Sequence, residues 1–150
     1  MPGVGPQQQE PQREAPRAAV RPAQILIVND DLEIRLKMAT LLRRAEPSAD
    51  SDGMGLAAYA ALGADALRRY RAVFFFLQFA GGPGAVAETL LPVARLRDQS
   101  PRTLIFVIAR GGDERTAVRA IKTGASDYWP AHAIDVRDLA EAIKPAMPAP

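Results

Sequence analysis

The residues whose types suggest chemistry most directly follow an apolar run from Ile25 to Val28, where the chain reads Asn29-Asp30-Asp31. Adjacent carboxylates and an amide oxygen are hard ligands of the kind that hold Mg²⁺. Asp30 and Glu33 also have the spacing of a capping box at the start of a helix, and we favour this structural role. The sequence predicts weak metal binding at most, and no cofactor.

The composition excludes most other catalytic chemistry. The 150 residues include no cysteine and one histidine, His132, which rules out thiolate catalysis and zinc sites built from cysteines or several histidines. The glycine-rich segment from Gly81 to Gly84 lacks the Lys-Ser/Thr of a phosphate-binding loop. Asp113, after Gly111-Gly112, is interpreted as a helix N-cap. We therefore expect a protein that is not an enzyme.

The two ends of the sequence differ from its middle. Residues 1–22 contain five prolines and a run of glutamines, and are predicted to form a disordered tail. Residues 145–150 are Pro/Ala-rich and are predicted to be a linker toward an output domain. Residues 23–144 form the one expected domain. No apolar run reaches the roughly 20 residues of a membrane span, and no signal peptide is visible, so we expect a cytoplasmic protein. The excess of arginine over lysine favours a bacterial source.

Between the ends, short apolar runs alternate with segments of helical period, which is typical of a parallel sheet covered by crossover helices. The predicted strands are residues 25–28, 56–59, 73–77, 104–109 and 127–129. Helices are predicted after 31, over 64–70, over 85–98 with a kink or restart at Pro92, over 113–123 and around 136–143. Val118 and Ile121 are expected to face inward. The sequence thus predicts an α/β fold with a doubly wound, five-stranded parallel sheet.

Three stretches resemble the receiver domain of bacterial response regulators, and the resemblance spans Ile25 to Ile143. They are the apolar run ending in Asn29-Asp30-Asp31, the segment from Tyr70 to Gly84, and Ala-Val-Arg-Ala-Ile-Lys-Thr-Gly-Ala-Ser-Asp-Tyr over residues 117–128. The third stretch is the most specific, because the pattern Gly-Ala-x-Asp-Tyr at the start of the final strand is typical of receiver domains. The resemblance implies the flavodoxin-like fold with strand order 2-1-3-4-5 and a phosphoryl-transfer site.

That site requires an acceptor carboxylate, two acidic metal ligands, a hydroxyl and a lysine. The family pattern places the acceptor at Phe76, the hydroxyl at Ile108, the lysine at Ala131 and the following proline at His132. The first acidic position is Asn29, which leaves Asp30 and Asp31 as remnant acids. No Asp or Glu occurs over 66–87, no Ser or Thr over 104–115 and no Lys over 123–143, so a shifted alignment does not restore the site. The resemblance is thus to a degenerate pseudo-receiver.

We expect such a module to act through protein contacts, without phosphorylation, and to regulate an attached output domain. The expected face combines the fourth helix, the fifth strand and the fifth helix, and would take a partner protein or form a homodimer. Its candidate residues are Arg115, Arg119, Lys122, Tyr128, Trp129, His132 and Arg137, with tyrosine, tryptophan and arginine being common in interface hot spots. Whether Trp129 contacts a partner or packs over the sheet edge is left open by the sequence. No binding to nucleic acid or membrane is expected of this domain.

Three alternatives remain at this point. The first is a phosphorylatable receiver with a displaced acceptor, which the missing carboxylates disfavour. The second is a small flavodoxin-like enzyme or flavin-binding domain, which lacks a Ser/Thr-rich phosphate loop after the first strand. The third is direct DNA binding, for which no recognition-helix pattern is present. The identity of the output domain is not indicated; it could be a cyclic-di-GMP enzyme, a protein kinase, a transcription factor or a pilus regulator.

Overall fold

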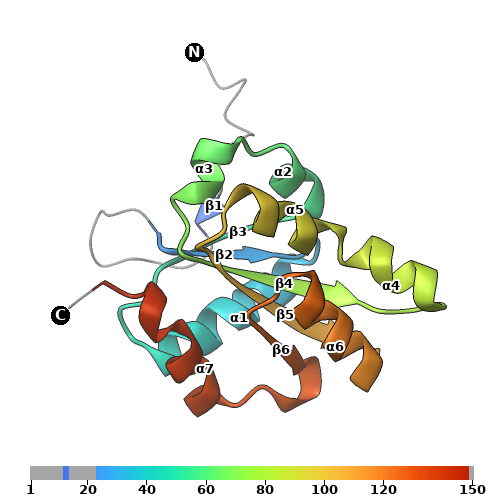
Figure 1. Cartoon of the computed structure of the whole chain (residues 1–150). Helices are drawn as coiled ribbons and strands as arrows, with labels where there is room; N and C mark the ends of the chain where they lie inside the picture. Colours follow the sequence, from blue (N-terminus) through green and yellow to red (C-terminus); the bar gives the residue numbers. More distant parts are fainter. Residues whose placement is uncertain (1–11, 14–22, 149–150) are drawn as a thin grey trace.

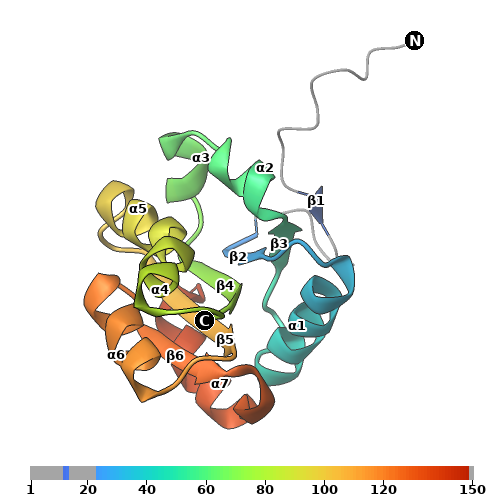
Figure 2. The same cartoon turned by 90° about the vertical axis from the view of Figure 1, so that its right-hand side faces the viewer.

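The computed structural model describes residues 12–13 and 23–148. These residues form one twisted sheet with helices on both faces (Figures 1 and 2). The strands are β1 (Gln12–Arg13), β2 (Ile25–Val28), β3 (Ser51–Met54), β4 (Ala72–Gln78), β5 (Leu104–Arg110) and β6 (Asp127–Pro130). They lie in the order β1-β3-β2-β4-β5-β6, and all pairs are parallel except β1 with β3. Numbered from β2, the five parallel strands have the order 2-1-3-4-5, which confirms the predicted fold.

The helices divide between the two faces of the sheet, as the crossover connections require. They are α1 (Leu32–Ala45), α2 (Leu56–Ala60), α3 (Ala64–Arg68), α4 (Pro83–Thr89), α5 (Leu91–Gln99), α6 (Glu114–Thr123) and α7 (Val136–Ile143), with 3-10 turns η2 (Ala131–Ala133) and η3 (Lys144–Ala146). One core packs α1 and α7 against one face, and the other packs residues of α2, α3, α5 and α6 against the opposite face. The break predicted at Pro92 is the junction of α4 and α5 at Leu90.

The second parallel strand is not where the sequence predicted it. The strand lies at Ser51–Met54, and the predicted strand over residues 56–59 is the helix α2. Alanine-rich sequence favours a helix, and Tyr59 packs its ring edge-on against Phe75 at a centroid distance of 5.2 Å. The polar strand β3 can be buried because its polar groups have partners. The Tyr70 hydroxyl donates to Asp52 at 2.7 Å, and β1 pairs with the outer edge of the strand.

The ends of the domain also extend beyond the predicted boundaries. Gln12 and Arg13, inside the expected tail, pair with Gly53 and Asp52; the rest of residues 1–22 lies outside the described residues. At the other end, Ala146 is buried in η3 and Met147 packs against the core formed with α1 and α7. The first residues of the expected linker are therefore part of the domain, while residues 149–150 are outside the described part.

The outward face of α6 contradicts another prediction. Val118 and Ile121, expected to face inward, are 51% and 47% exposed. The residues of α6 that enter the core are the small ones, Thr116 and Ala120. A helix that packs against the sheet through small side chains can approach the sheet closely. Its larger apolar side chains then lie on the surface. α6 thus presents an apolar pair to solvent.

Candidate functional site

The carboxyl ends of the parallel strands meet at one edge of the sheet, where this fold places its ligand sites. Asn29 follows β2 and lies beside the end of β4, since its side-chain amide donates to the Phe76 carbonyl at 3.1 Å. Phe76 pairs in register with Ile108, and Ile108 pairs with Trp129. Phe76 and Ala131 are partly buried against the core that contains Ile108. The structure therefore brings together Asn29, Phe76, Ile108 and Ala131, which the family pattern assigns to the phosphoryl-transfer site.

The three polar residues after β2 are each bound to backbone. The Asn29 side-chain oxygen accepts from the Asp31 amide at 2.8 Å, in addition to the bond from its nitrogen to Phe76. Asp31 is the N-cap of α1 and accepts from the Glu33 amide at 2.9 Å. The predicted capping box had assigned this role to Asp30; the cap lies one residue later, because α1 begins at Leu32.

Asp30 has a different structural role. Its Oδ1 accepts from the Leu56 amide at 2.9 Å, at the first turn of α2. The N-cap of α2 is Gly55, which has no side chain with which to cap the helix, so Asp30 supplies the missing acceptor from another loop. A Cβ at Gly55 would lie 2.8 Å from that oxygen. The glycine is what allows Asp30 to approach the backbone of α2.

A positive charge also contacts this loop. The Arg35 guanidinium donates to the Asn29 carbonyl at 2.6 Å from the first turns of α1. Sequence reasoning did not identify Arg35, Gly55 or Leu56 as part of this region. The position of Arg35 in the first turn of the predicted helix, seven residues after the end of β2, was a usable signal. The contact between residues 30 and 56 depends on β3, whose position the sequence did not predict. No group of three or more Asp, Glu or His residues able to hold a metal occurs in 12–13 and 23–148.

The neighbouring loop after β5 turns into α6 through Asp113. Asp113 accepts from the Thr116 amide at 3.1 Å, and the Thr116 hydroxyl in turn accepts from the Asp113 amide, which completes a capping box. These hydrogen bonds from Thr116 lower the pKa of the Asp113 carboxyl. The interpretation of Asp113 as a helix N-cap is therefore confirmed.

The aromatic pair on β6 points to the two faces of the sheet. Trp129 is 8% exposed and packs against Phe106 at a ring-centroid distance of 5.5 Å, so it does not offer its ring to a partner as the candidate face required. Alternation along the strand is the reason, since the inward position here meets the core of α1 and α7. Tyr128 is half-buried on the other face; its burial raises its pKa, and the negative charge of Asp113 adds to this.

The remaining candidate residues lie on the surface around β6. Arg115, Arg119 and Lys122 are exposed on α6, His132 is exposed on η2, and Arg137 is exposed on α7. A cavity of about 680 Å³ lies between the loop after β5 and the turn after β6; its lining includes Glu114, Tyr128 and His132. All of the candidate residues except Trp129 thus lie on the accessible surface formed by α6, β6, η2 and α7.

Comparison with known proteins supports the fold. No family model matches this sequence, and no curated protein matches it. Solved structures do match: a pilus assembly-related protein from Burkholderia pseudomallei K96243 superposes with a TM-score of 0.67 at 19% identity, covering 83% of this chain and 88% of that one. An orphan response regulator of H. pylori gives a TM-score of 0.61 at 17% identity over 87% of this chain and 98% of that chain.

A response regulator receiver domain protein from Clostridium thermocellum gives a TM-score of 0.61 at 18% identity, covering 83% of this chain and 93% of that chain. The superpositions cover nearly the whole of the H. pylori and C. thermocellum structures. They agree with the parallel sheet described above. None of the helices in the described part of the chain is long and apolar enough to span a membrane. The chain has the fold of response regulator receiver domains.

Proposed function

We propose that this chain is a signalling module of receiver type that works through protein contacts and does not take up phosphate on an aspartate. The observation that carries the proposal is the use of the polar groups at the carboxyl edge. Asp30 caps α2, Asp31 caps α1, and Asn29 spans from its own loop to β4. Phosphoryl transfer to a carboxylate needs a nucleophile beside a bound metal ion, and a phenylalanine at position 76 supplies neither.

Hydrocarbon side chains next to this loop support the same conclusion. Ile108 is fully buried, and Phe76 is partly buried beside it. A receiver with several carboxylates at this edge must hold like charges close together, which raises the free energy of the folded state. An apolar filling removes that repulsion and stabilises a single chemical state of the domain.

The experiment is a titration of the full chain, followed by amide NMR, with Mg²⁺ and then beryllofluoride, a phosphoryl mimic that binds acceptor carboxylates. The amides of Asp30, Phe76 and Tyr128 are expected not to show saturating shifts at millimolar concentrations. Incubation with a small acyl phosphate, followed by intact mass measurement, is expected to add no phosphate. Saturating shifts or an added phosphate would contradict the proposal and would point to an acceptor elsewhere.

We infer that the contact is made between two copies of the chain through α6, β6 and α7. Val118 and Ile121 form an exposed apolar pair on α6, and the cations Arg115, Arg119 and Lys122 surround it. The exposed surface of α7 and its N-cap carries three acids, Asp135, Asp138 and Glu141, beside one cation, Arg137. A two-fold arrangement that sets α6 of one copy against α7 of the other would pair opposite charges around an apolar centre.

Sedimentation velocity on charge variants tests the dimer. Arg119→Glu is expected to weaken self-association at least tenfold, because it places an acid opposite the acids of α7. Adding Asp138→Arg to that variant is expected to restore association. Arg95→Glu, an exposed arginine of α5 outside the face, is the matched control and is expected to have no effect. A monomer at all concentrations, or equal weakening by the control, would overturn the dimer.

A further inference from the structure

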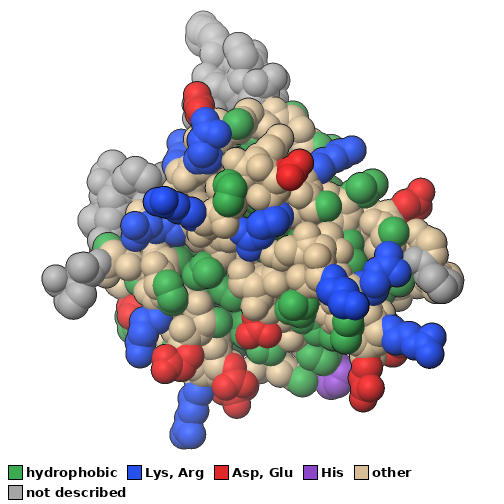
Figure 3. All heavy atoms as spheres, in the orientation of Figure 1, with side chains coloured by type: hydrophobic (Ala, Val, Ile, Leu, Met, Phe, Trp, Pro, Cys, Tyr) green, Lys and Arg blue, Asp and Glu red, His purple; other side chains and the backbone are tan. Residues whose placement is uncertain are grey.

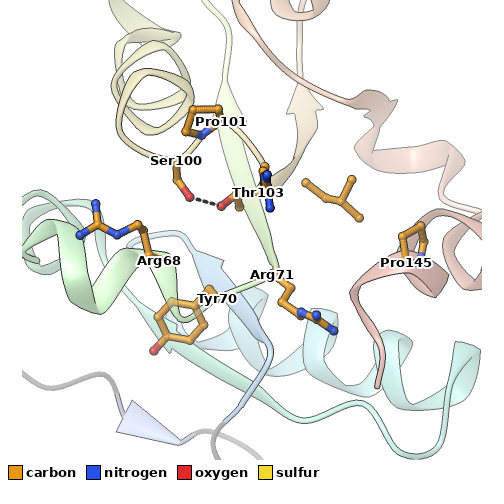
Figure 4. A pocket seen from close by; sticks show the side chains of 9 residues that line it. Arg68, Tyr70, Arg71, Ser100, Pro101, Thr103 and Pro145 are labelled. Atoms are coloured by element: carbon orange, nitrogen blue, oxygen red, sulfur yellow. Dashed lines mark hydrogen bonds between the residues drawn. The ribbon is translucent and has the colours of Figure 1, made fainter. Parts of the chain in front are cut away.

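The edge of the sheet opposite the site described above contains a separate cavity. Its volume is about 510 Å³, and it lies between the end of α3, the turn that joins α5 to β5, and η3 (Figure 4). The lining residues are Arg68, Tyr70, Arg71, Ser100, Pro101, Arg102, Thr103, Leu104 and Pro145. This volume lies within the range of about 300–1,000 Å³ typical of small-ligand sites.

The charged side chains that line the cavity are all positive. Three of its nine lining residues are arginines, and none is acidic. Arg68 is held by an ion pair with Asp65, and Figure 4 shows its side chain and that of Arg71 extending to opposite sides. Arg71 and Arg102 are exposed, and neither guanidinium has a hydrogen bond or ion pair within the described residues. Figure 3 shows basic side chains gathered on this side of the molecule, between α3 and the C-terminal end.

Two buried hydroxyl groups lie in the same wall of the cavity. Ser100 and Thr103 are 6% and 4% exposed, and their hydroxyl oxygens are 2.5 Å apart, as the dashed line in Figure 4 marks. One of their two protons makes this hydrogen bond, and neither hydroxyl has another acceptor among the described residues. The second proton is therefore available to an acceptor that enters the cavity, and a buried donor of this kind gains from being paired.

The backbone carbonyl oxygens of the turn between α5 and β5 accept hydrogen bonds from Arg97. The Arg97 guanidinium donates to the carbonyl of Pro101 at 2.9 Å and to that of Thr103 at 2.9 Å, with a longer bond to Ser100 at 3.4 Å. The partial negative charges of the turn are thus neutralised by a residue that does not line the cavity. Three carbonyl oxygens of this turn are therefore already paired when an anion enters the cavity.

We propose that this cavity binds the phosphate group of a small anionic ligand, with Arg71, Arg102 and the Ser100–Thr103 hydroxyl pair as its donors. Guanidinium groups match phosphate in charge and geometry, and a hydroxyl donor adds a directional bond. The cavity lies at the starts of β4 and β5, which are paired along their whole length up to the carboxyl edge. The proposal does not depend on the function proposed above, since the two sites share no residue.

The test uses amide NMR of the full chain at fixed ionic strength, with inorganic phosphate and ADP as probes and chloride as the background anion. Saturating shifts are expected at the amides of Arg71, Ser100, Arg102 and Thr103. Binding of phosphate and ADP with equal affinity would identify a site for free phosphate or a simple phosphate ester. Tighter binding of ADP, with further shifts at Tyr70 and Leu104, would identify a nucleotide.

Variants decide whether the named donors are responsible. Arg71→Gln with Arg102→Gln is expected to weaken binding at least tenfold, whereas Lys37→Gln with Arg95→Gln, which removes the same charge from exposed positions of α1 and α5, is expected to leave it unchanged. Thr103→Val, which keeps the shape and removes one hydroxyl, is expected to weaken it at least threefold. Because Arg71 and Arg102 are exposed, their variants should fold normally. Shifts that do not saturate, or equal weakening by both double variants, would overturn the proposal.

Discussion

At the scale of single residues, the loop after β2 shows how the same side chains can bind either a ligand or the backbone. Asp30 and Asp31 have the residue types of metal ligands, yet each accepts a backbone amide at a helix start. Backbone amides at helix N-termini have no partner within the helix, so a nearby carboxylate satisfies them and also interacts favourably with the helix dipole. The residue types and a cap at the start of α1 could be identified from the sequence, whereas the bond from Leu56 to Asp30 could not, because only the fold brings these two residues together.

Gly55 provides a direct test of this contact. Gly55→Ala would place a Cβ 2.8 Å from the Asp30 carboxylate and is expected to break its bond to the Leu56 amide. The expected cost is about 1–2 kcal/mol in the free energy of unfolding, measured in urea. Gly63→Ala is the matched control, because Gly63 is also the N-cap of a short helix without a side-chain cap, and a Cβ there meets nothing within 4 Å. Equal effects of the two substitutions would contradict the proposed role of Gly55.

Two buried tyrosines predict how stability depends on alkaline pH. Burial raises the pKa of Tyr59 to about 12, and burial with the hydrogen bond to Asp52 raises the pKa of Tyr70 further. An unfolded tyrosine loses its proton near pH 10, so between about pH 10 and 12 the folded chain holds more protons, and stability falls as pH rises.

The expected loss is about 1.4 kcal/mol per pH unit for each tyrosine in this range. Urea unfolding at pH 9 to 11.5 should show a shallower decline for Tyr59→Phe, because this variant has one group fewer to ionise. Tyr59 is the better choice for substitution, since its hydroxyl only donates to the Pro92 carbonyl at 3.3 Å, whereas Tyr70 is the donor to the buried Asp52. Parallel curves for the two proteins would show that Tyr59 is not the source of the dependence.

At the scale of elements, the periodicity of the sequence predicted the long, strongly apolar strands and the helices between them. β4 and β5 are runs of large apolar residues buried from both sides, and this pattern has few other structural solutions. β3 could not be predicted in the same way, because Ser51, Asp52 and Gly53 are poor strand formers that become buried only when Tyr70 and β1 satisfy them. The orientation of α6 was missed for a related reason: the helix packs through Thr116 and Ala120, which carry little hydrophobic signal.

Arg97 links several elements and gives a prediction at this scale. From α5, its guanidinium donates to the Gly124 carbonyl at the end of α6 and to carbonyls of the turn before β5. Arg97→Met keeps most of the side-chain length and leaves these carbonyls unpaired, so we expect a loss of about 2 kcal/mol in the free energy of unfolding. Arg95→Met, at an exposed position of the same helix, is expected to change it by less than about 0.5 kcal/mol. A similar loss in both variants would indicate a general effect of charge removal.

At the scale of the whole molecule, the sheet has one edge that depends on a distant segment. Beyond β3 the sheet is completed by the two residues of β1, and β6 forms the other edge. An unpaired edge strand exposes backbone donors and acceptors to solvent. Removal of residues 1–22 should therefore leave the domain folded and should raise the amide exchange rates of some residues in Ser51–Met54 at least tenfold. Exchange in β4, which has a strand on each side, should not change, and unaltered exchange in β3 would show that β1 does not protect it.

The position of β2 at the centre of the sheet has a consequence for the chain during its synthesis. All four residues of β2 are buried, between β3 on one side and β4 on the other. A ribosome delivers this strand before both of its partners, so its apolar residues have no strand to pair with until Met54, the end of β3, has emerged, and one side stays unpaired until Gln78, the end of β4, has followed. For that interval the nascent chain carries an exposed apolar strand, which is a recognised hazard for aggregation and an expected target of chaperones.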